Sequence, residues 1–341
     1  MLNAGWFNNR QENAEVLQPD FFSPKTQLWI YAELPEIEFP IKVNITAQYM
    51  NNGMFQKSYI IENVDTSTEC KFELFADANV FVLRDFPNTL AHNPDQIDIE
   101  ICMGKHTYTQ TIACEYATIS GKITDFDDKP FPAAVVYNLL GFEGMETGLG
   151  VWSDTDGNYS ITLPKGDYNS IFVDDSSYGQ TSLEAWGWKM IVDRDEIHDY
   201  KIGNGEVYSL DVWANNGGFQ NLFIVFRPMA LAYVIKQSGS NMDINSKDYT
   251  VVDTCPDIDI NDVSVKINNC NATVVSLQKI FETGSDGLAM PLYVLQVERL
   301  ATSGKQTLVV EYGFTDSGGN IIQSQGRTQF NYVNVNRLAI R

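Results

Sequence analysis

Aspartate residues gather in two short polar stretches near the middle of the chain. One stretch holds Asp125 and Asp127, and a later one holds Asp154 and Asp156. Carboxylate oxygens are the hard ligands that Ca²⁺ prefers, and the loops at one end of a β-sandwich converge in space. The two pairs are therefore a candidate calcium site, although their spacing matches no EF-hand loop. Aspartate also forms turns by accepting hydrogen bonds from its own backbone, so calcium binding and simple turn formation both stay open.

Two tryptophans, Trp186 and Trp188, are two residues apart, which places both side chains on one face of a β-strand. A flat aromatic surface suits the stacking of a sugar ring, so a carbohydrate-binding site is one interpretation of this pair. The other interpretation is packing in a core or at a subunit interface, because each tryptophan can bury ~200 Å². Near the N-terminus, Trp6 and Phe7 interrupt a polar stretch and are further candidate contacts with a partner or a glycan.

Catalytic signatures are scarce in this sequence. It contains no Gly-x-Ser-x-Gly elbow, no phosphate-binding glycine loop and no His-Glu-x-x-His zinc motif. The three histidines, His92, His106 and His198, are far apart and have no recognisable partner. We therefore expect a protein that is not an enzyme and that has no certain cofactor, with calcium as the open question.

A succession of short strands and turns fills the region from Gly121 to Val173. Asp156-Gly157 predicts a two-residue hairpin turn with positive φ, and Pro164-Lys165-Gly166 predicts a second reversal. This stretch, about residues 117–175, resembles the carboxypeptidase regulatory-like domain, a β-sandwich related to transthyretin and to collagen-adhesin B-type repeats. The resemblance is carried by Gly121, Asp125, Pro130, Ala134, Asp154, Gly157, Tyr159, Leu163, Gly166 and Tyr168. It implies a spacing or display module and no reaction.

Alternating polar and apolar residues continue through most of the chain, with no amphipathic helix between the strands. This pattern predicts an all-β protein of three tandem β-sandwich domains. The expected divisions are an extended arm at 1–24, an immunoglobulin-like sandwich at 25–116, the regulatory-like sandwich with extra strands at 117–235, a polar linker at 236–248 and a C-terminal sandwich at 249–341. Hairpin turns are expected at Asn51-Asn52-Gly53 and at Met103-Gly104-Lys105.

The overall charge limits the classes of partner. The 341 residues carry a formal net charge of -21, which argues against nucleic acid because phosphate recognition needs clustered Lys and Arg. No apolar run approaches the ~20 residues of a membrane-spanning helix, so membrane insertion is not expected. No secretion signal is visible at the N-terminus. Of the five cysteines, Cys255 and Cys270, or Cys102 and Cys114, could form a disulfide.

These features together predict a structural or adhesive subunit of an extracellular surface layer, an appendage, a fibre, or a spore or virion surface. We expect it to assemble with copies of itself or with other surface proteins, in part through the arm at 1–24. The alternative is a carbohydrate-binding protein that uses Trp186 and Trp188.

Overall fold

The computed structural model describes the chain in several segments, and almost all of its regular structure is β-strand. The described residues are 2–7, 27–32, 41–51, 54–66, 95–103, 106–113, 115–138, 149–175, 177–215, 221–236, 239–244, 246–284, 286–298 and 303–332. Within them the helical elements are α2 (Leu231–Lys236) and the 3-10 turn η2 (Ile260–Asp262). The all-β fold class is therefore confirmed. None of the helices in these segments has the length and apolar character needed to cross a membrane.

The N-terminal region contains a pair of antiparallel strands and a four-stranded sheet. The pair consists of β1 (Leu2–Phe7) and β2 (Gln27–Ala32). The sheet has the order β4-β3-β5-β6 and consists of β3 (Ile41–Asn51), β4 (Met54–Thr66), β5 (Gln96–Met103) and β6 (His106–Ala113). Because β3 pairs with β4 and β5 pairs with β6 in antiparallel register, the two hairpins expected in this region are confirmed.

The middle region forms a β-sandwich. One sheet has the order β10-β7-β13, with β14 also on β7, and consists of β7 (Tyr116–Thr124), β10 (Asn158–Pro164), β13 (Glu196–Ile197) and β14 (Tyr200–Lys201). The strands of the other are β8 (Ala134–Asn138), β9 (Leu149–Trp152), β11 (Gly166–Asp174) and β12 (Ala185–Val192). The inward-facing residues of β7, β8, β10 and β11 are buried and form the core. Among these core residues are Ile119, Tyr137, Tyr159 and Tyr168.

The reversal at Asp156-Gly157 exists, but it is not the two-residue hairpin that the sequence predicted. Gly157 has a φ of 79°, whereas Asp156 does not adopt positive φ. The strands on either side, β9 and β10, belong to different sheets. The chain therefore turns a corner of the sandwich here, and the corner is closed by a hydrogen bond of 3.0 Å from the Gly157 amide to the carbonyl oxygen of Asp154.

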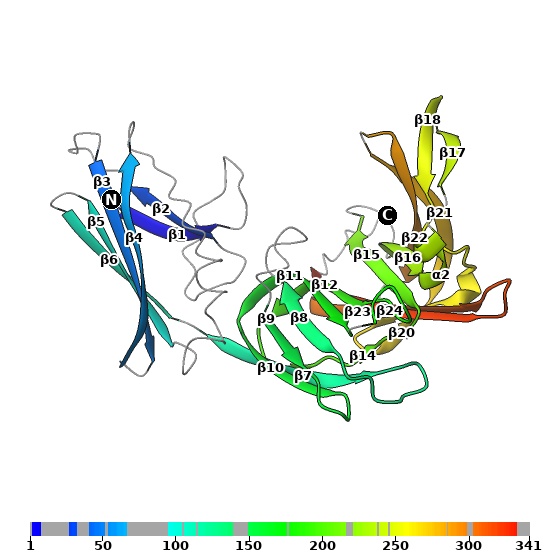
Figure 1. The fold of residues 1–341 in the computed structure, drawn as a ribbon, viewed down its shortest axis with the longest axis horizontal. Coiled ribbons are helices and arrows are strands. Elements are labelled where there is room, and N and C mark those ends of the chain that lie inside the picture. The colour runs from blue at the N-terminus through cyan, green and yellow to red at the C-terminus, as the bar shows by residue number, and fades with distance from the viewer. Residues whose placement is uncertain are drawn as a thin grey trace, which may run out of the picture.

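One sheet of the middle sandwich continues into the C-terminal region (Figure 1). β12 pairs in parallel with β24 (Ile321–Tyr332), so that Trp186 lies beside Gly326 and Trp188 beside Thr328. The result is an eight-stranded sheet with the order β20-β19-β23-β24-β12-β11-β8-β9. Its remaining strands are β19 (Val263–Ile267), β20 (Cys270–Ala272) and β23 (Gly304–Thr315).

A second sheet packs against the C-terminal half of this long sheet. It consists of β15 (Gly205–Ala214), β16 (Asn221–Ala230), β17 (Gly239–Ile244), β18 (Lys247–Val252), β21 (Val274–Thr283) and β22 (Leu288–Glu298). The core between the two sheets includes Val207, Ile224, Phe226, Leu295 and Val310.

Strand pairing crosses the domain divisions that were expected from the sequence. β15 and β16 fall in the expected middle domain, 117–235, yet β16 pairs with β22 of the C-terminal region. The stretch 236–248, expected to be a linker, contains β17, which pairs with β18 in the same sheet. Residues 205–230 and 239–252 therefore share a sheet with the C-terminal sandwich.

The cysteines in the described segments are free thiols. Cys255 is buried and its thiol donates a hydrogen bond of 3.1 Å to the carbonyl oxygen of Pro291. Cys270 is exposed, so the disulfide considered between Cys255 and Cys270 is not formed. Cys102 is also free, and Cys114 lies outside the described residues.

Candidate functional site

The aspartates proposed as calcium ligands are engaged in turns. Oδ1 of Asp125 accepts the backbone amides of Asp127 and Lys129, each at 2.9 Å. Oδ1 of Asp154 accepts the amide of Asp156 at 2.9 Å in the same way. In the described residues, no group of three or more His, Cys, Asp or Glu side chains is arranged to hold a metal ion. These contacts are the turn chemistry that was the other interpretation, and calcium binding stays a prediction.

Of the tryptophan pair, Trp186 lies inside the protein and Trp188 is partly buried. The rings of Trp186 and Trp188 stack with their centroids 4.7 Å apart, as a spacing of two along a strand predicts. Tyr208 of β15 meets both rings edge-on, at 5.6 and 5.2 Å. Trp186 is only 2% exposed, so its face is covered by protein and is not available to stack on a sugar. Among the tryptophans whose side chains the structure describes, Trp152, at 67%, and Trp213, at 42%, are the more exposed.

The two N-terminal candidates, Trp6 and Phe7, lie in β1. Their backbones are in register with Leu28 and Gln27 of β2. Of the histidines, His92 lies outside the described residues and His106 begins β6. His198 is buried, at 4% exposure, and belongs to the network described next.

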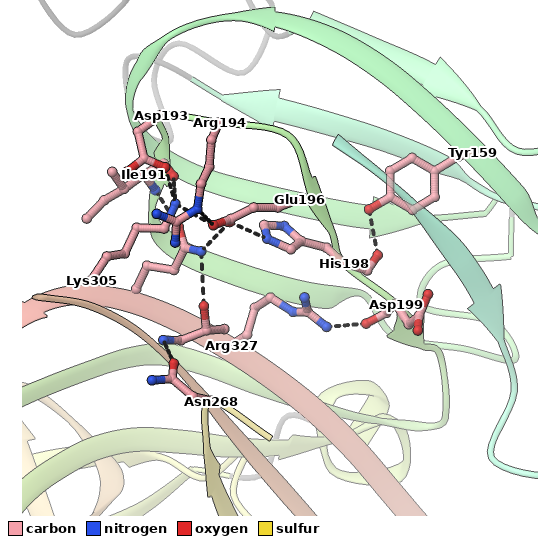
Figure 2. A network of polar contacts seen from close by, with 12 residues as sticks. Tyr159, Ile191, Asp193, Arg194, Glu196, His198, Asp199, Asn268, Lys305 and Arg327 are labelled. Carbon is pink, nitrogen blue, oxygen red and sulfur yellow. Dashed lines mark hydrogen bonds and ion pairs between the residues drawn. The ribbon is translucent and has the colours of Figure 1, made fainter. Parts of the chain in front are cut away.

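A network of charged side chains joins the middle sandwich to the C-terminal one (Figure 2). Its centre is Lys305 of β23, whose side chain is only 6% exposed. The Lys305 ammonium lies 2.5 Å from Oδ1 of Asp193 and 2.8 Å from Oε1 of Glu196, both in the segment that follows β12. It also donates to the carbonyl oxygen of Ile191 at 2.8 Å. We call Lys305, Asp193 and Glu196 the junction triad.

Glu196 connects the junction triad to several other side chains. Oε2 of Glu196 accepts hydrogen bonds from His198 and from Gln329 of β24, each at 3.0 Å, and Arg194 lies 3.2 Å from Oε1. Burial opposes ionisation of Glu196, but the hydrogen bonds from His198, Lys305 and Gln329 outweigh it and lower its pKa to about 2. Burial also lowers the pKa of His198. Near neutral pH the network therefore has an ionised Glu196 and a neutral His198.

Arg327 of β24 makes a second link between the two sandwiches. The Arg327 guanidinium carbon lies 4.3 Å from the centre of the Tyr200 ring in β14, and its terminal nitrogen donates to the carbonyl oxygen of Asp199. The neighbouring residue, Gly326, packs so closely on β15 that an added Cβ would lie 2.6 Å from the Cβ of Val207. β24 is thus covered by the middle sandwich on one face and by β15 on the other.

The contacts at this junction hold the segment after β12 against β23. Within the described residues, the carboxylates and the ammonium group of the junction triad are bound to one another and to neighbouring side chains. The arrangement resembles an internal brace between the two sandwiches.

Sequence reasoning did not identify the junction triad. Lys305 is separated from Asp193 and Glu196 by most of the C-terminal region, and no local motif connects them. They meet only because β12 pairs with β24 and β24 pairs with β23. His198 was noted in the sequence only as a histidine without a recognisable partner, and in the structure its partner is Glu196, two residues away.

No protein-family model matches the chain, and a comparison with curated proteins also finds no match. Among solved structures, a Bacteroides uniformis protein to which carbohydrate binding is ascribed is 15% identical, with 63% of this chain and 98% of that chain covered and a TM-score of 0.24. The major pilin subunit BcpA of Bacillus cereus is 12% identical, with coverage of 63% and 69% and a TM-score of 0.20. A streptococcal ancillary pilin is 8% identical, with coverage of 88% and 92% and a TM-score of 0.19. At these values the likeness carries no conclusion about function.

Proposed function

We propose that this chain is a non-enzymatic structural or adhesive subunit of a surface layer, an appendage or a fibre. The observation that carries the proposal is the junction between the two sandwiches. A shared eight-stranded sheet and a partly buried ion network connect the two modules, and we infer that they behave as one stiff body. Stiff coupling of this kind sets spacing and transmits force, which are the tasks of an assembled surface structure. A flexible pair of modules would serve neither task.

The surface of the protein also supports assembly. In the described residues, β21 pairs with β22 alone and lies at the edge of its sheet. Its side chains include the exposed apolar residues Val275 and Ile280. An open edge of this length can accept a strand from another chain. The net charge of -21 favours solubility before assembly and suits a protein that works outside the cell or on a surface.

Negative-stain electron microscopy of the purified full chain tests this proposal. We expect filaments or sheets that form as the protein concentration rises. A variant without residues 1–24 tests whether the expected arm contributes, and assembly should weaken when the arm is removed. A parallel sample with EDTA tests the calcium prediction, and assembly should be unchanged if the aspartates serve only as turn residues. Dispersed particles at every concentration would contradict the proposed function.

Carbohydrate binding is the alternative function. A titration of the protein with polysaccharides distinguishes it from the structural role. The alternative relied on Trp186 and Trp188, and of these Trp186 is buried. We therefore expect the intrinsic tryptophan fluorescence to stay constant when polysaccharides are added. A saturable change that disappears in a Trp152→Ala or Trp213→Ala variant would favour sugar binding through the exposed tryptophans.

A further inference from the structure

Three carboxyl groups meet beside the buried tryptophans, where β11 ends and where β12 and β15 begin. β11 and β12 pair antiparallel as far as Val173 and Ala185. Continuing this register by one residue places Asp174 across from Glu184, and the charge of Asp174 raises the pKa of Glu184. The third carboxyl group belongs to Glu206 of β15, which is only 1% exposed. Like charges directly opposite each other in a strand pair are destabilising. The fold has therefore placed acidic side chains where ionised forms are unfavourable.

The three carboxyl groups share the same aromatic neighbours. Trp186 lies near both glutamates and partly offsets the rise of their pKa values. Tyr178, in the loop between β11 and β12, lies within the electrostatic influence of all three carboxyl groups, and burial and these charges raise its pKa to about 12. Burial and the charges of the two glutamates raise the pKa of Tyr208 to about 12 as well. The cluster thus connects the loop at 177–184 with β12 and β15.

Among the described residues, little positive charge compensates this cluster. Oδ1 of Asp174 and Oε2 of Glu206 are buried and have no hydrogen-bond partner within the described residues. Arg227, the cation nearby on β16, is bound to Glu282 at 2.6 Å. Asp175 adds negative charge beside Asp174. Burying an unpaired charge is costly, and the cost is avoided when the carboxyl group keeps its proton.

We propose that Asp174, Glu184 and Glu206 form a proton-binding cluster that holds β11, β12 and β15 together when it is protonated and loosens them when it ionises. We call these three residues the carboxyl cluster. The proposal concerns a response to pH, and it is independent of the proposed structural function. It assigns a role to acidic residues that the junction triad does not use.

The sign of the effect follows from the pKa values. Burial, reinforced by neighbouring negative charge, raises the pKa of Asp174 to about 6 and of Glu184 to about 7, and it raises the pKa of Glu206 well above its usual value. In the unfolded chain these groups ionise near pH ~4. Their contribution to stability is therefore fully present below pH ~4 and is lost as the pH rises through the higher folded values.

Thermal unfolding of the full chain at about pH 5 and about pH 8 tests the proposal, using the isosteric triple variant Asp174→Asn, Glu184→Gln, Glu206→Gln. We expect the triple variant to raise the Tm at about pH 8 by ~3 °C or more and to change it much less at about pH 5. The exposed carboxylate Asp127 provides the matched control, and Asp127→Asn should have the same small effect at both pH values. An equal shift of the triple variant at both pH values would overturn the proposal.

Tryptophan fluorescence gives a second readout, because Trp186 and Trp188 lie beside the carboxyl cluster. We expect a pH titration of the wild-type chain to show a transition between about pH 6 and about pH 8. The transition should be absent from the triple variant. If the triple variant does not fold, the same fluorescence titration is made on the single variant Glu184→Gln. This substitution should lower the amplitude of the transition. An unchanged midpoint and amplitude in the variants would show that the carboxyl cluster does not titrate in this range.

Discussion

Replacing Lys305 with methionine is expected to lower the free energy of unfolding by ~3 kcal/mol, which corresponds to a fall in Tm of ~6–12 °C. Methionine fills a similar volume but removes the ammonium group that lies 2.5 Å from Asp193 and 2.8 Å from Glu196. Glu196, whose side chain is 15% exposed, is then left partly buried without its main cation. Chemical denaturation of the full chain measures the change.

A double-mutant cycle shows whether the loss comes from the ion pair. The double variant Lys305→Met, Glu196→Gln should lose less free energy of unfolding than the two single variants together. The reason is that Glu196→Gln removes the charge that Lys305→Met leaves unpaired. The control is Lys189→Met, which breaks an exposed ion pair with Asp211 of 2.7 Å. That change should cost no more than ~0.5 kcal/mol. A loss in Lys305→Met as small as in Lys189→Met would contradict a bracing role for the junction triad.

The junction triad and the carboxyl cluster respond to pH in opposite directions. The pKa of Glu196 is lowered to about 2, so its contribution to stability is present above the usual value of ~4 and is lost as the pH falls through about 2. The lowered pKa of His198 acts in the same direction at mildly acidic pH. The carboxyl cluster instead destabilises the protein as the pH rises. A stability maximum at mildly acidic pH follows from the two effects together.

The second large effect is expected at Gly157, where alanine should lower the free energy of unfolding by ~3 kcal/mol or more. Gly157 has a φ of 79°, and a Cβ at this position would lie 2.2 Å from the carbonyl oxygen of Ile123. Alanine would thus adopt an unfavourable backbone conformation and would also push β7 away from the corner. Thermal unfolding of Gly157→Ala measures the combined cost.

Gly179→Ala separates the two contributions. Gly179 has a φ of 70°, but a Cβ there meets nothing within 4 Å. This control therefore carries only the backbone cost, which is ~1–2 kcal/mol. We expect Gly157→Ala to be clearly more destabilising than Gly179→Ala. Equal losses would mean that close packing on Ile123 does not matter.

Local patterns in the sequence were sufficient for the fold class and for several turns. Period-2 alternation predicts strands because successive side chains point to opposite faces of a sheet. Gly157 was expected to have positive φ, and it has. The sheet to which each flanking strand belongs could not be read from the turn, because a hairpin and a corner of a sandwich use similar residues.

Long-range pairing was the part that the sequence could not supply. Nothing in the residues around Trp186 indicates that β12 would pair with β24, and the junction triad depends on that pairing. The tryptophan pair was ambiguous because burial is a property of the whole fold. The carboxyl cluster had a local signal: Glu184 is in phase with Trp186 and Trp188, and Glu206 is in phase with Tyr208. An acidic residue on the apolar face of a strand indicates a buried charge or a bound proton.

Native-state hydrogen exchange of the full chain tests most directly whether the two sandwiches form one body. If they do, amides in β11 and β12 and amides in β23 and β24 should exchange with the same opening free energy, because the shared sheet and the junction triad make them one cooperative unit. The Lys305→Met substitution should lower the opening free energies of both sets of amides by the same amount. The claim of one body would be contradicted if the amides of β23 and β24 exchanged while those of β8 and β11 stayed protected.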